Sequence, residues 1–161
     1  MNTPEQELFS LLLERGLTLS AAESCTGGLI AKRMTDLPGA SKVFCGGVVS
    51  YWSEVKASVL GVPQAAIDEF GAVSEPVARA MAEGVRRITN SSLGVSVTGV
   101  AGPDADDRGN AVGTVYIAAA DETETVCRLF SFGALSRGEI REKAADAAFI
   151  LATELLNKKK A

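Results

Sequence analysis

The order in which helical and extended patterns follow one another restricts the fold of this sequence more than any other feature. Up to about residue 90 most apolar residues recur at helical spacing, with two extended segments between them. Three extended segments then follow in succession, and a long helical pattern comes last. Helices that precede and follow a run of strands pack most simply on the two faces of one sheet. The order therefore predicts an α/β fold, a three-layer α/β/α sandwich with a mixed sheet.

Capping residues, glycines and prolines set the expected boundaries of these elements. The helical patterns run over residues 3–16, 29–34, 53–60, 63–70, 74–88 and 136–157. The extended patterns run over 17–21, 43–51, 93–98, 112–120 and 125–132, and the second is expected to be bulged at Gly46 and Gly47. No segment has the composition of a linker, so we expect one domain over residues 1–161.

Composition and charge narrow the range of partners. Of the 161 residues, 47% are hydrophobic and 22% are charged, as is usual for a globular chain. The formal net charge of −4 offers no basic surface for a phosphate backbone, which argues against nucleic acid as a partner. No apolar run approaches the roughly 20 residues of a membrane span, and no basic segment precedes an apolar one at the N-terminus. We therefore expect a cytoplasmic protein without membrane contact.

The sequence contains no histidine, and this excludes several common kinds of catalytic site. Ser-His-Asp and Cys-His mechanisms and most zinc hydrolase sites need an imidazole. Cys25, Cys45 and Cys127 are odd in number and form no C-x-x-C pair, which argues against both a disulfide framework and a zinc site. Any chemistry must use lysine, tyrosine, carboxylate, serine or cysteine, and we predict no metal and no cofactor.

Three glycine-containing segments, 24–28, 45–47 and 99–102, lie at expected strand ends. In open α/β sheets, ligands collect where strand ends meet helix N-termini, so two of the three segments are expected to line one pocket. Each segment alone is more simply explained by a turn that needs positive φ. None of them matches a P-loop or a dinucleotide fingerprint.

Ser24, Cys25 and Lys56 are the candidate reactive side chains. The Ser24 hydroxyl precedes a glycine-rich helix start whose free N–H groups could hold an oxyanion, although a plain N-cap is the simpler interpretation. Cys25 competes as nucleophile but has no histidine to activate it. Lys56 lies in the first turn of an expected helix, where the macrodipole disfavours a cation. To act as a base it would need its pKa lowered by about 2 to 3 units from ~10.4; otherwise it is a solvated surface lysine.

Five segments of the chain, in this order, carry a resemblance to a known family. They closely resemble the CinA C-terminal domain family, the competence/damage-inducible proteins that include stand-alone nicotinamide-mononucleotide deamidases. The resemblance extends from about Leu8 to Leu156. The segments are 22–28 (AESCTGG), 47–56 (GVVSYWSEVK), 71–78 (GAVSEPVA), 98–103 (TGVAGP) and 112–115 (VGTV).

The resemblance implies an amidohydrolase that converts nicotinamide mononucleotide to nicotinate mononucleotide and ammonia, without metal, in pyridine nucleotide recycling. By motif, the nucleophile falls on Ser24, the base on Lys56 and an assisting tyrosine on Tyr51. The substrate is then a small nucleotide, and the resemblance and the broad apolar helix faces are compatible with a homodimer. The remaining expected site residues are Cys25, Thr26 and Gly27 for the oxyanion, Thr98, Gly99 and Gly102 for ribose or phosphate, and Arg141 for phosphate.

The chain departs from the family pattern at two places. The usual Ser-Asn after the tyrosine is Trp52-Ser53 here, and the usual Lys-Pro before Val112 is Asn110-Ala111. The first departure adds an indole beside the expected base and leaves two alternatives open. One is a non-catalytic nucleotide-binding or regulatory domain of the same family. The other is an enzyme that uses the Cys25 thiol as nucleophile.

Overall fold

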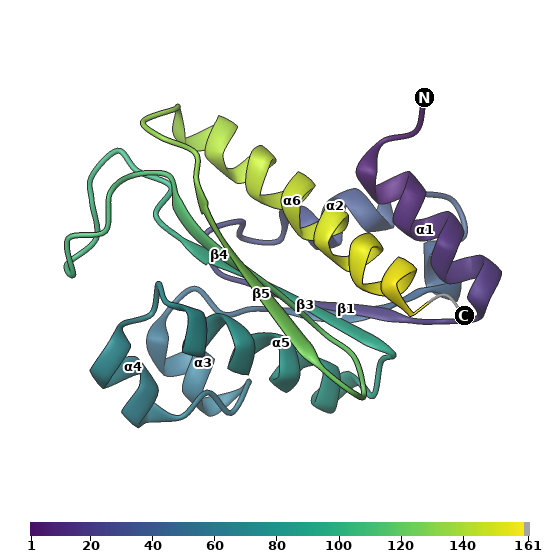
Figure 1. Cartoon of the computed structure of the whole chain (residues 1–161), viewed down its shortest axis with the longest axis horizontal. Coiled ribbons are helices and arrows are strands. Elements are labelled where there is room, and N and C mark those ends of the chain that lie inside the picture. Colours follow the sequence, from purple (N-terminus) through teal and green to yellow (C-terminus); the bar gives the residue numbers. More distant parts are fainter. Residues whose placement is uncertain (160–161) are drawn as a thin grey trace.

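The computed structural model describes residues 1–159 and arranges them in three layers around a five-stranded sheet (Figure 1). The strands lie in the order β2-β1-β3-β4-β5, of which β1, β2 and β3 are parallel while β4 and β5 are antiparallel to their neighbours. The predicted α/β/α sandwich with a mixed sheet is confirmed. The strands are β1 (Leu19–Glu23), β2 (Phe44–Val49), β3 (Leu93–Gly99), β4 (Thr114–Ala120) and β5 (Thr125–Ser131).

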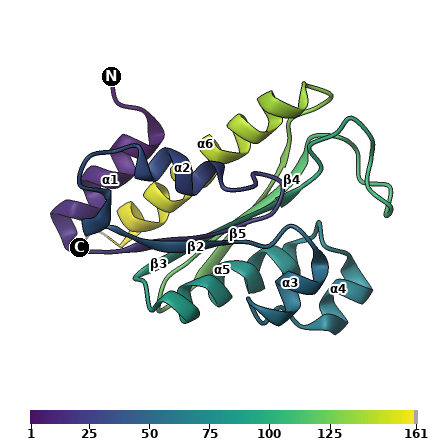
Figure 2. The same cartoon turned by 180° about the vertical axis from the view of Figure 1, so that it is seen from behind.

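Three helices cover each face of the sheet (Figures 1 and 2). One face carries α1 (Pro4–Arg15), α2 (Leu29–Thr35) and α6 (Arg137–Lys158). The other carries α3 (Ser53–Ser58), α4 (Gln64–Phe70) and α5 (Glu75–Thr89), and a short 3₁₀ turn, η1 (Ala40–Lys42), precedes β2. No helix within residues 1–159 is both long enough and apolar enough to cross a membrane.

Local capping fixes the ends of the two outer helices. Thr3 and Gln6 form a capping box at the start of α1, and Ser136 and Glu139 form another at the start of α6. Gly16 ends α1 in the left-handed conformation, with φ of 64°. These signals are local in sequence, which is why the predicted boundaries of both helices agree with the structure to within one residue.

The two faces of the sheet are packed differently. Leu8, Leu12, Ile140 and Phe149 belong to the larger apolar cluster, under α1, α2 and α6. On the opposite face the helix α5 lies close to the sheet because small residues face each other there: Ala78 and Ala82 on the helix and Ala118 and Ala120 on β4. Burial of apolar area on both faces supplies the main stabilisation of this arrangement.

The strand boundaries differ from the sequence-based expectation at β1, β2 and β4, and β2 ends at Val49 rather than 51. The strand β1 begins at Leu19 rather than 17, and all five of its residues are buried because it lies between β2 and β3. A strand buried on both faces has no alternation from which to read its ends. The strand β4 begins at Thr114 rather than 112, because Ala111 and Thr114 close a turn in which Gly113 has φ of 90°.

The irregularity in β2 also lies beside its expected position. The register passes from the Leu19–Phe44 pair to the Ser20–Gly46 pair, so Cys45 is the extra residue.

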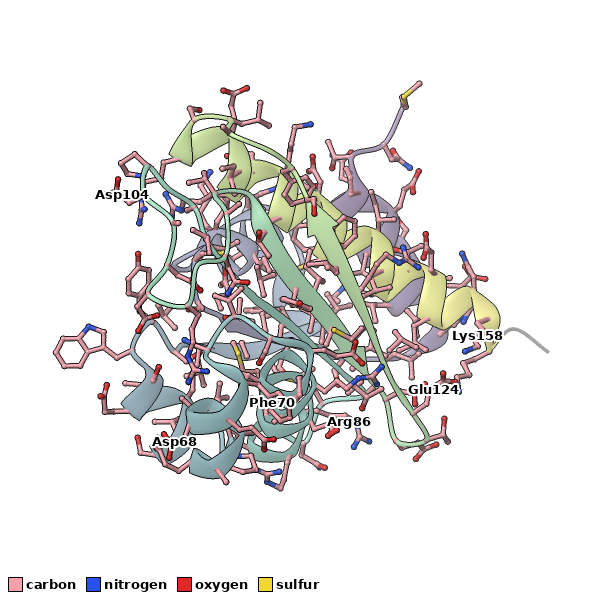
Figure 3. The ribbon with its side chains drawn as sticks, turned by 60° about the vertical axis from the view of Figure 1, so that its left-hand side comes forward. Asp68, Phe70, Arg86, Asp104, Glu124 and Lys158 are labelled. Carbon is pink, nitrogen blue, oxygen red and sulfur yellow. The ribbon has the colours of Figure 1, made fainter. Side chains whose placement is uncertain are left out.

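At the opposite edge of the sheet from β2, an ion pair joins the β4–β5 hairpin to the end of α6. Lys158 Nζ lies 2.8 Å from Glu124 Oε1; the lysine side chain is exposed and the glutamate side chain is partly buried (Figure 3).

Close backbone packing predicts which glycine the fold requires. A Cβ atom at Gly84 of α5 would overlap the carbonyl group of Leu60, whereas a Cβ at Gly138 of α6 has open space. We expect Gly84→Ala to lower the free energy of unfolding by about 1–3 kcal/mol. Gly138→Ala, the matched helical control, should leave it unchanged or raise it by up to about 1 kcal/mol. Urea unfolding followed by circular dichroism measures both, and equal stability of the two variants would contradict the packing argument.

Candidate active site

Ser24 follows the last residue of β1 and is held by the neighbouring strand. Its N–H donates to the carbonyl oxygen of Val97 in β3 at 2.9 Å, and the residue is 8% exposed. The hydroxyl therefore lies at the carboxyl end of a central parallel strand. This is the edge of an α/β sheet at which ligands commonly bind.

The turn after Ser24 is closed by glycine conformations and by a buried carboxylate. Gly27 and Gly28 have φ of 56° and 104°, which lets the chain reverse into α2. Gly28 has no side chain with which to cap the helix. The Glu23 carboxylate takes that place, accepting from the N–H of Ile30 at 2.8 Å and of Ala31 at 3.1 Å. Sequence reasoning missed this role, because no capping pattern places the acceptor five residues before the N-cap.

An arginine fixes α2 against the two outer helices. Arg33 in α2 lies 2.7 Å from Glu5 of α1 and 2.7 Å from Asp146 of α6, and its guanidinium stacks over Phe149, 5.2 Å from the ring centre. The Arg33 side chain is 13% exposed, so these charges are partly shielded from water. The helix that begins at the Ser24 turn is thus anchored at its far end.

Lys56 is one of the largest fully buried side chains in the described part of the chain, with 1% exposure. It is the fourth residue of α3, and its Nζ lies 2.8 Å from Ser24 Oγ, 2.6 Å from the Ser50 carbonyl oxygen and 3.2 Å from the Tyr51 carbonyl oxygen. A neutral amine has two N–H donors and one lone pair. It can therefore donate to both carbonyl groups while its lone pair accepts the Ser24 O–H.

Burial lowers the pKa of Lys56 from its ordinary value of 10.5 to about 8. Desolvation penalises the charged amine, and within residues 1–159 no carboxylate forms an ion pair with it. The change has the direction and size that a lysine base requires. A solvated surface lysine, the simpler interpretation from sequence, does not agree with this burial.

A cavity of about 190 Å³ opens onto these groups. Six of the residues expected at the site line it, and the glycine-containing segments 24–28 and 99–102 both contribute, as predicted. The segment 45–47 does not. The lining residues are Ser24, Cys25, Tyr51, Lys56, Ala72, Val73, Thr98, Gly99, Ala101 and Arg137.

Four of the expected residues lie outside the lining of the cavity. Thr26 is fully buried, and its Oγ1 has no hydrogen-bond partner in residues 1–159. Gly27 forms the turn. Arg141 is engaged by the turn, because its Nε donates to the Cys25 carbonyl oxygen at 3.1 Å and its Nη2 to that of Thr26 at 2.8 Å. Arg141 therefore braces the segment that carries Ser24. Gly102 does not line the cavity, and its carbonyl oxygen accepts a hydrogen bond from Nη1 of Arg137.

Contacts within the fold account for the residue types at positions 98 and 99, which were expected to contact ribose or phosphate. The hydroxyl of Thr98 donates to the Ala72 carbonyl oxygen at 2.8 Å, which joins β3 to the segment before α5. A Cβ at Gly99 would lie 2.7 Å from Val115 Cγ2, so the close approach of β3 and β4 requires a glycine. Both residues line the cavity, but each has a structural task as well.

Arg137, which sequence reasoning did not select, lies at the cavity. Its Nη2 donates to the hydroxyl of Tyr51 at 2.7 Å, and its Nη1 donates to the carbonyl oxygen of Gly102. The arginine connects the start of α6 to the segment before Lys56. The sequence does show that Arg137 begins a helix, because it follows the capping residue Ser136. It does not show that this end of α6 faces the Ser24 cavity.

The Cys25 thiol lines the same cavity but is poorly suited to act as nucleophile. It is 5% exposed, and burial raises its pKa to about 11. The reactive form of cysteine is the thiolate, which is scarce near neutral pH when the pKa lies so high. The geometry favours the Ser24 hydroxyl over its neighbour.

Other parts of the molecule lack this combination of groups. Within residues 1–159, no group of three or more Cys, Asp or Glu side chains is placed to hold a metal ion. A larger hollow of about 540 Å³ lies at the opposite ends of the strands, beside Leu17 and Leu93. Two of the charged side chains there are engaged: Arg15 with the Leu156 carbonyl group and Lys159 with Glu124.

Comparison with known proteins places the chain among CinA proteins. The model of the CinA C-terminal domain family matches residues 1–156. A CinA-like protein of Syntrophus aciditrophicus is 46% identical over 149 residues, which cover 92% of this chain and 36% of that protein. The chain spans about a third of the length of the curated relatives it matches.

Solved structures of similar proteins have the same fold over nearly the whole chain. The competence/damage inducible protein CihA of Agrobacterium tumefaciens has a TM-score of 0.90 at 33% identity, covering 98% of this chain and 97% of that one. The competence damage-inducible protein A of Klebsiella pneumoniae has a TM-score of 0.94 at 28% identity, covering 99% of this chain and 100% of that one.

The contrast between Cys25 and Cys45 predicts their relative reactivity. Cys45 is exposed on the edge strand β2, whereas Cys25 is buried with a raised pKa. We expect iodoacetamide at neutral pH to alkylate Cys45 at least about ten-fold faster than Cys25. Peptide mass spectrometry over a time course measures both rates, and Cys45→Ser confirms the assignment of the fast site. Equal alkylation rates would support the alternative in which the Cys25 thiol is the nucleophile.

Proposed function

The chain belongs to the CinA C-terminal domain family, and on that premise we propose that it hydrolyses the carboxamide of nicotinamide mononucleotide to nicotinate mononucleotide and ammonia. The observation that carries the proposal is the 2.8 Å contact between Lys56 Nζ and Ser24 Oγ. A hydroxyl beside an amine whose pKa is lowered to about 8 has a base within reach, because a useful fraction of that amine is neutral near neutral pH.

In the first step, neutral Lys56 accepts the Ser24 proton while Oγ attacks the carboxamide carbon. The bond from Oγ to carbon forms, and the carbonyl oxygen becomes an oxyanion. In residues 1–159 the N–H groups of Cys25 and Thr26 make no hydrogen bond, whereas that of Gly27 is engaged by the Ser24 carbonyl oxygen. Of these two residues only Cys25 lines the cavity, so its N–H is the donor we propose for the oxyanion, and one well-placed donor contributes about 3 to 4 kcal/mol to the transition state.

In the second step the carbon–nitrogen bond breaks, and the nitrogen leaves as ammonia with the proton that Lys56 carries. Water then attacks the acyl ester and gives its proton to Lys56, and Ser24 recovers its proton as the carboxylate leaves. Tyr51 presents its hydroxyl to Arg137 beside the same cavity, where it can orient the leaving nitrogen.

The size of the cavity suggests how a nucleotide would lie. Ligand pockets usually measure roughly 300–1,000 Å³, so about 190 Å³ accommodates the pyridine ring and its carboxamide but not the whole nucleotide. The ribose and phosphate would extend through the opening. Arg137 lines the cavity and Arg141 does not, so we propose Arg137 as the phosphate ligand in place of Arg141.

The buried amine favours catalysis over the non-catalytic alternative. Lowering the pKa of Lys56 from 10.5 to about 8 corresponds to about 3 kcal/mol against the charged form. A pocket that only binds a nucleotide gains nothing from this destabilised cation. A base needs it.

Removing either partner of the Ser24–Lys56 contact tests the proposal. We expect Ser24→Ala and Lys56→Met each to lower kcat for ammonia release from nicotinamide mononucleotide at least about a thousand-fold, because the two groups act as a unit. The matched controls are Ser58→Ala on α3 and Lys32→Met on α2, both exposed, which should retain activity. Circular dichroism verifies folding, and activity persisting in both site variants would refute the mechanism.

The titration of Lys56 predicts a pH dependence. Because only the neutral amine can accept the Ser24 proton, kcat/KM should rise with pH through an apparent pKa of about 8 and then level off. Below that pKa each pH unit should lower the rate about ten-fold. Initial rates of ammonia release across the neutral and mildly alkaline range measure the profile. A rate that is flat through this range, or that falls as pH rises, contradicts a lysine base.

A further inference from the structure

A shallow hollow of about 480 Å³ adjoins the Ser24 cavity. It is lined by Tyr51, Trp52, Ser53 and Glu54, and Tyr51 also lines the cavity, so the two spaces are neighbours. Trp52 is the sole tryptophan of the chain, and 71% of it is exposed. An indole so exposed contributes little to the core.

The backbone of Trp52 is fixed by the helix that carries Lys56. Its carbonyl oxygen accepts from the N–H groups of Val55 at 3.1 Å and Lys56 at 3.2 Å, which begins α3. The backbone of Trp52 is therefore fixed relative to the helix that carries Lys56, while its indole is exposed to solvent. Exposed aromatic side chains serve as platforms on which nucleobases stack.

Charge decides which part of a nucleotide the hollow suits. The Glu54 carboxylate lines it and disfavours a phosphate there, whereas the cation Arg137 lines the adjoining cavity. With the pyridine ring beside Ser24, a mononucleotide ends at its phosphate and has nothing to stack on an indole. A ligand that continues past its phosphates to a second, uncharged base would fill both spaces.

We propose that Trp52 is a specificity-determining residue that stacks on the second base of a pyridine dinucleotide, so that this chain prefers a dinucleotide amide to the mononucleotide. The inference rests on the proposed function, since it places the pyridine ring in the Ser24 cavity. The reaction is unchanged: the carboxamide and one water give the carboxylic acid and ammonia.

The first test measures binding without turnover. On the Ser24→Ala protein, calorimetric titration should give nicotinamide adenine dinucleotide a Kd about ten-fold lower than that of nicotinamide mononucleotide, as stacking of one base provides. The dinucleotide should also quench the emission of Trp52 with the same Kd. Absence of either the preference or the quenching would overturn the inference.

Further substitutions identify the residue responsible. Adding Trp52→Ser should remove the preference and leave the Kd of the mononucleotide unchanged, while Trp52→Phe should retain most of the preference. The matched control is Phe70→Ala, an exposed aromatic at the end of α4 that lines neither space, which should change neither Kd (Figure 3). A preference that survives Trp52→Ser overturns the inference.

Two further outcomes separate the inference from the proposed function. If the wild-type chain releases ammonia from the mononucleotide but the dinucleotide binds no more tightly, the stacking inference alone fails. If neither pyridine nucleotide binds or reacts, the proposed function fails with it. A shift of Trp52 emission with protein concentration, without ligand, would show that a second copy of the chain covers the hollow, and this also overturns the inference.

Discussion

The arrangement of the site depends on one amine that is buried without a counter-charge. The Nζ of Lys56 is surrounded by two carbonyl oxygens and the Ser24 hydroxyl, none of which carries a charge, so water removed by burial is replaced only by dipoles. The pKa falls to about 8 for that reason. A chain without histidine thus obtains a group that titrates near neutral pH by desolvating a lysine.

The surrounding structure keeps this contact in place from several directions. The N–H of Ser24 donates to β3, and Arg141 donates to two carbonyl oxygens of the turn that follows Ser24. The buried Glu23 carboxylate completes the start of α2. Each of these groups uses its hydrogen bonds on the backbone. The turn that carries Ser24 is thereby held in one conformation, and under the proposed mechanism this avoids an ordering cost at the moment of reaction.

Sequence reasoning located the site more reliably than it described it. Ser24 and Lys56 were selected by their positions at helix starts and by the family resemblance, and they prove to be in contact. Arg141 was expected to face the ligand but binds the turn instead, while Arg137, one helical turn earlier, reaches the cavity. The difference depends on the rotation of α6 about its axis, which is set by packing against the sheet rather than by any local pattern.

The sequence by itself determined the elements, because capping boxes, glycine turns and hydrophobic periods act over a few residues. Thr3, Gly16 and Ser136 set helix ends in this way. It also determined which kinds of chemistry are absent, through the lack of histidine. Only the tertiary structure decided the pKa of Lys56 and its 2.8 Å approach to Ser24, 32 residues away in the chain. Desolvation depends on atoms from many segments, and no stretch of sequence contains them together.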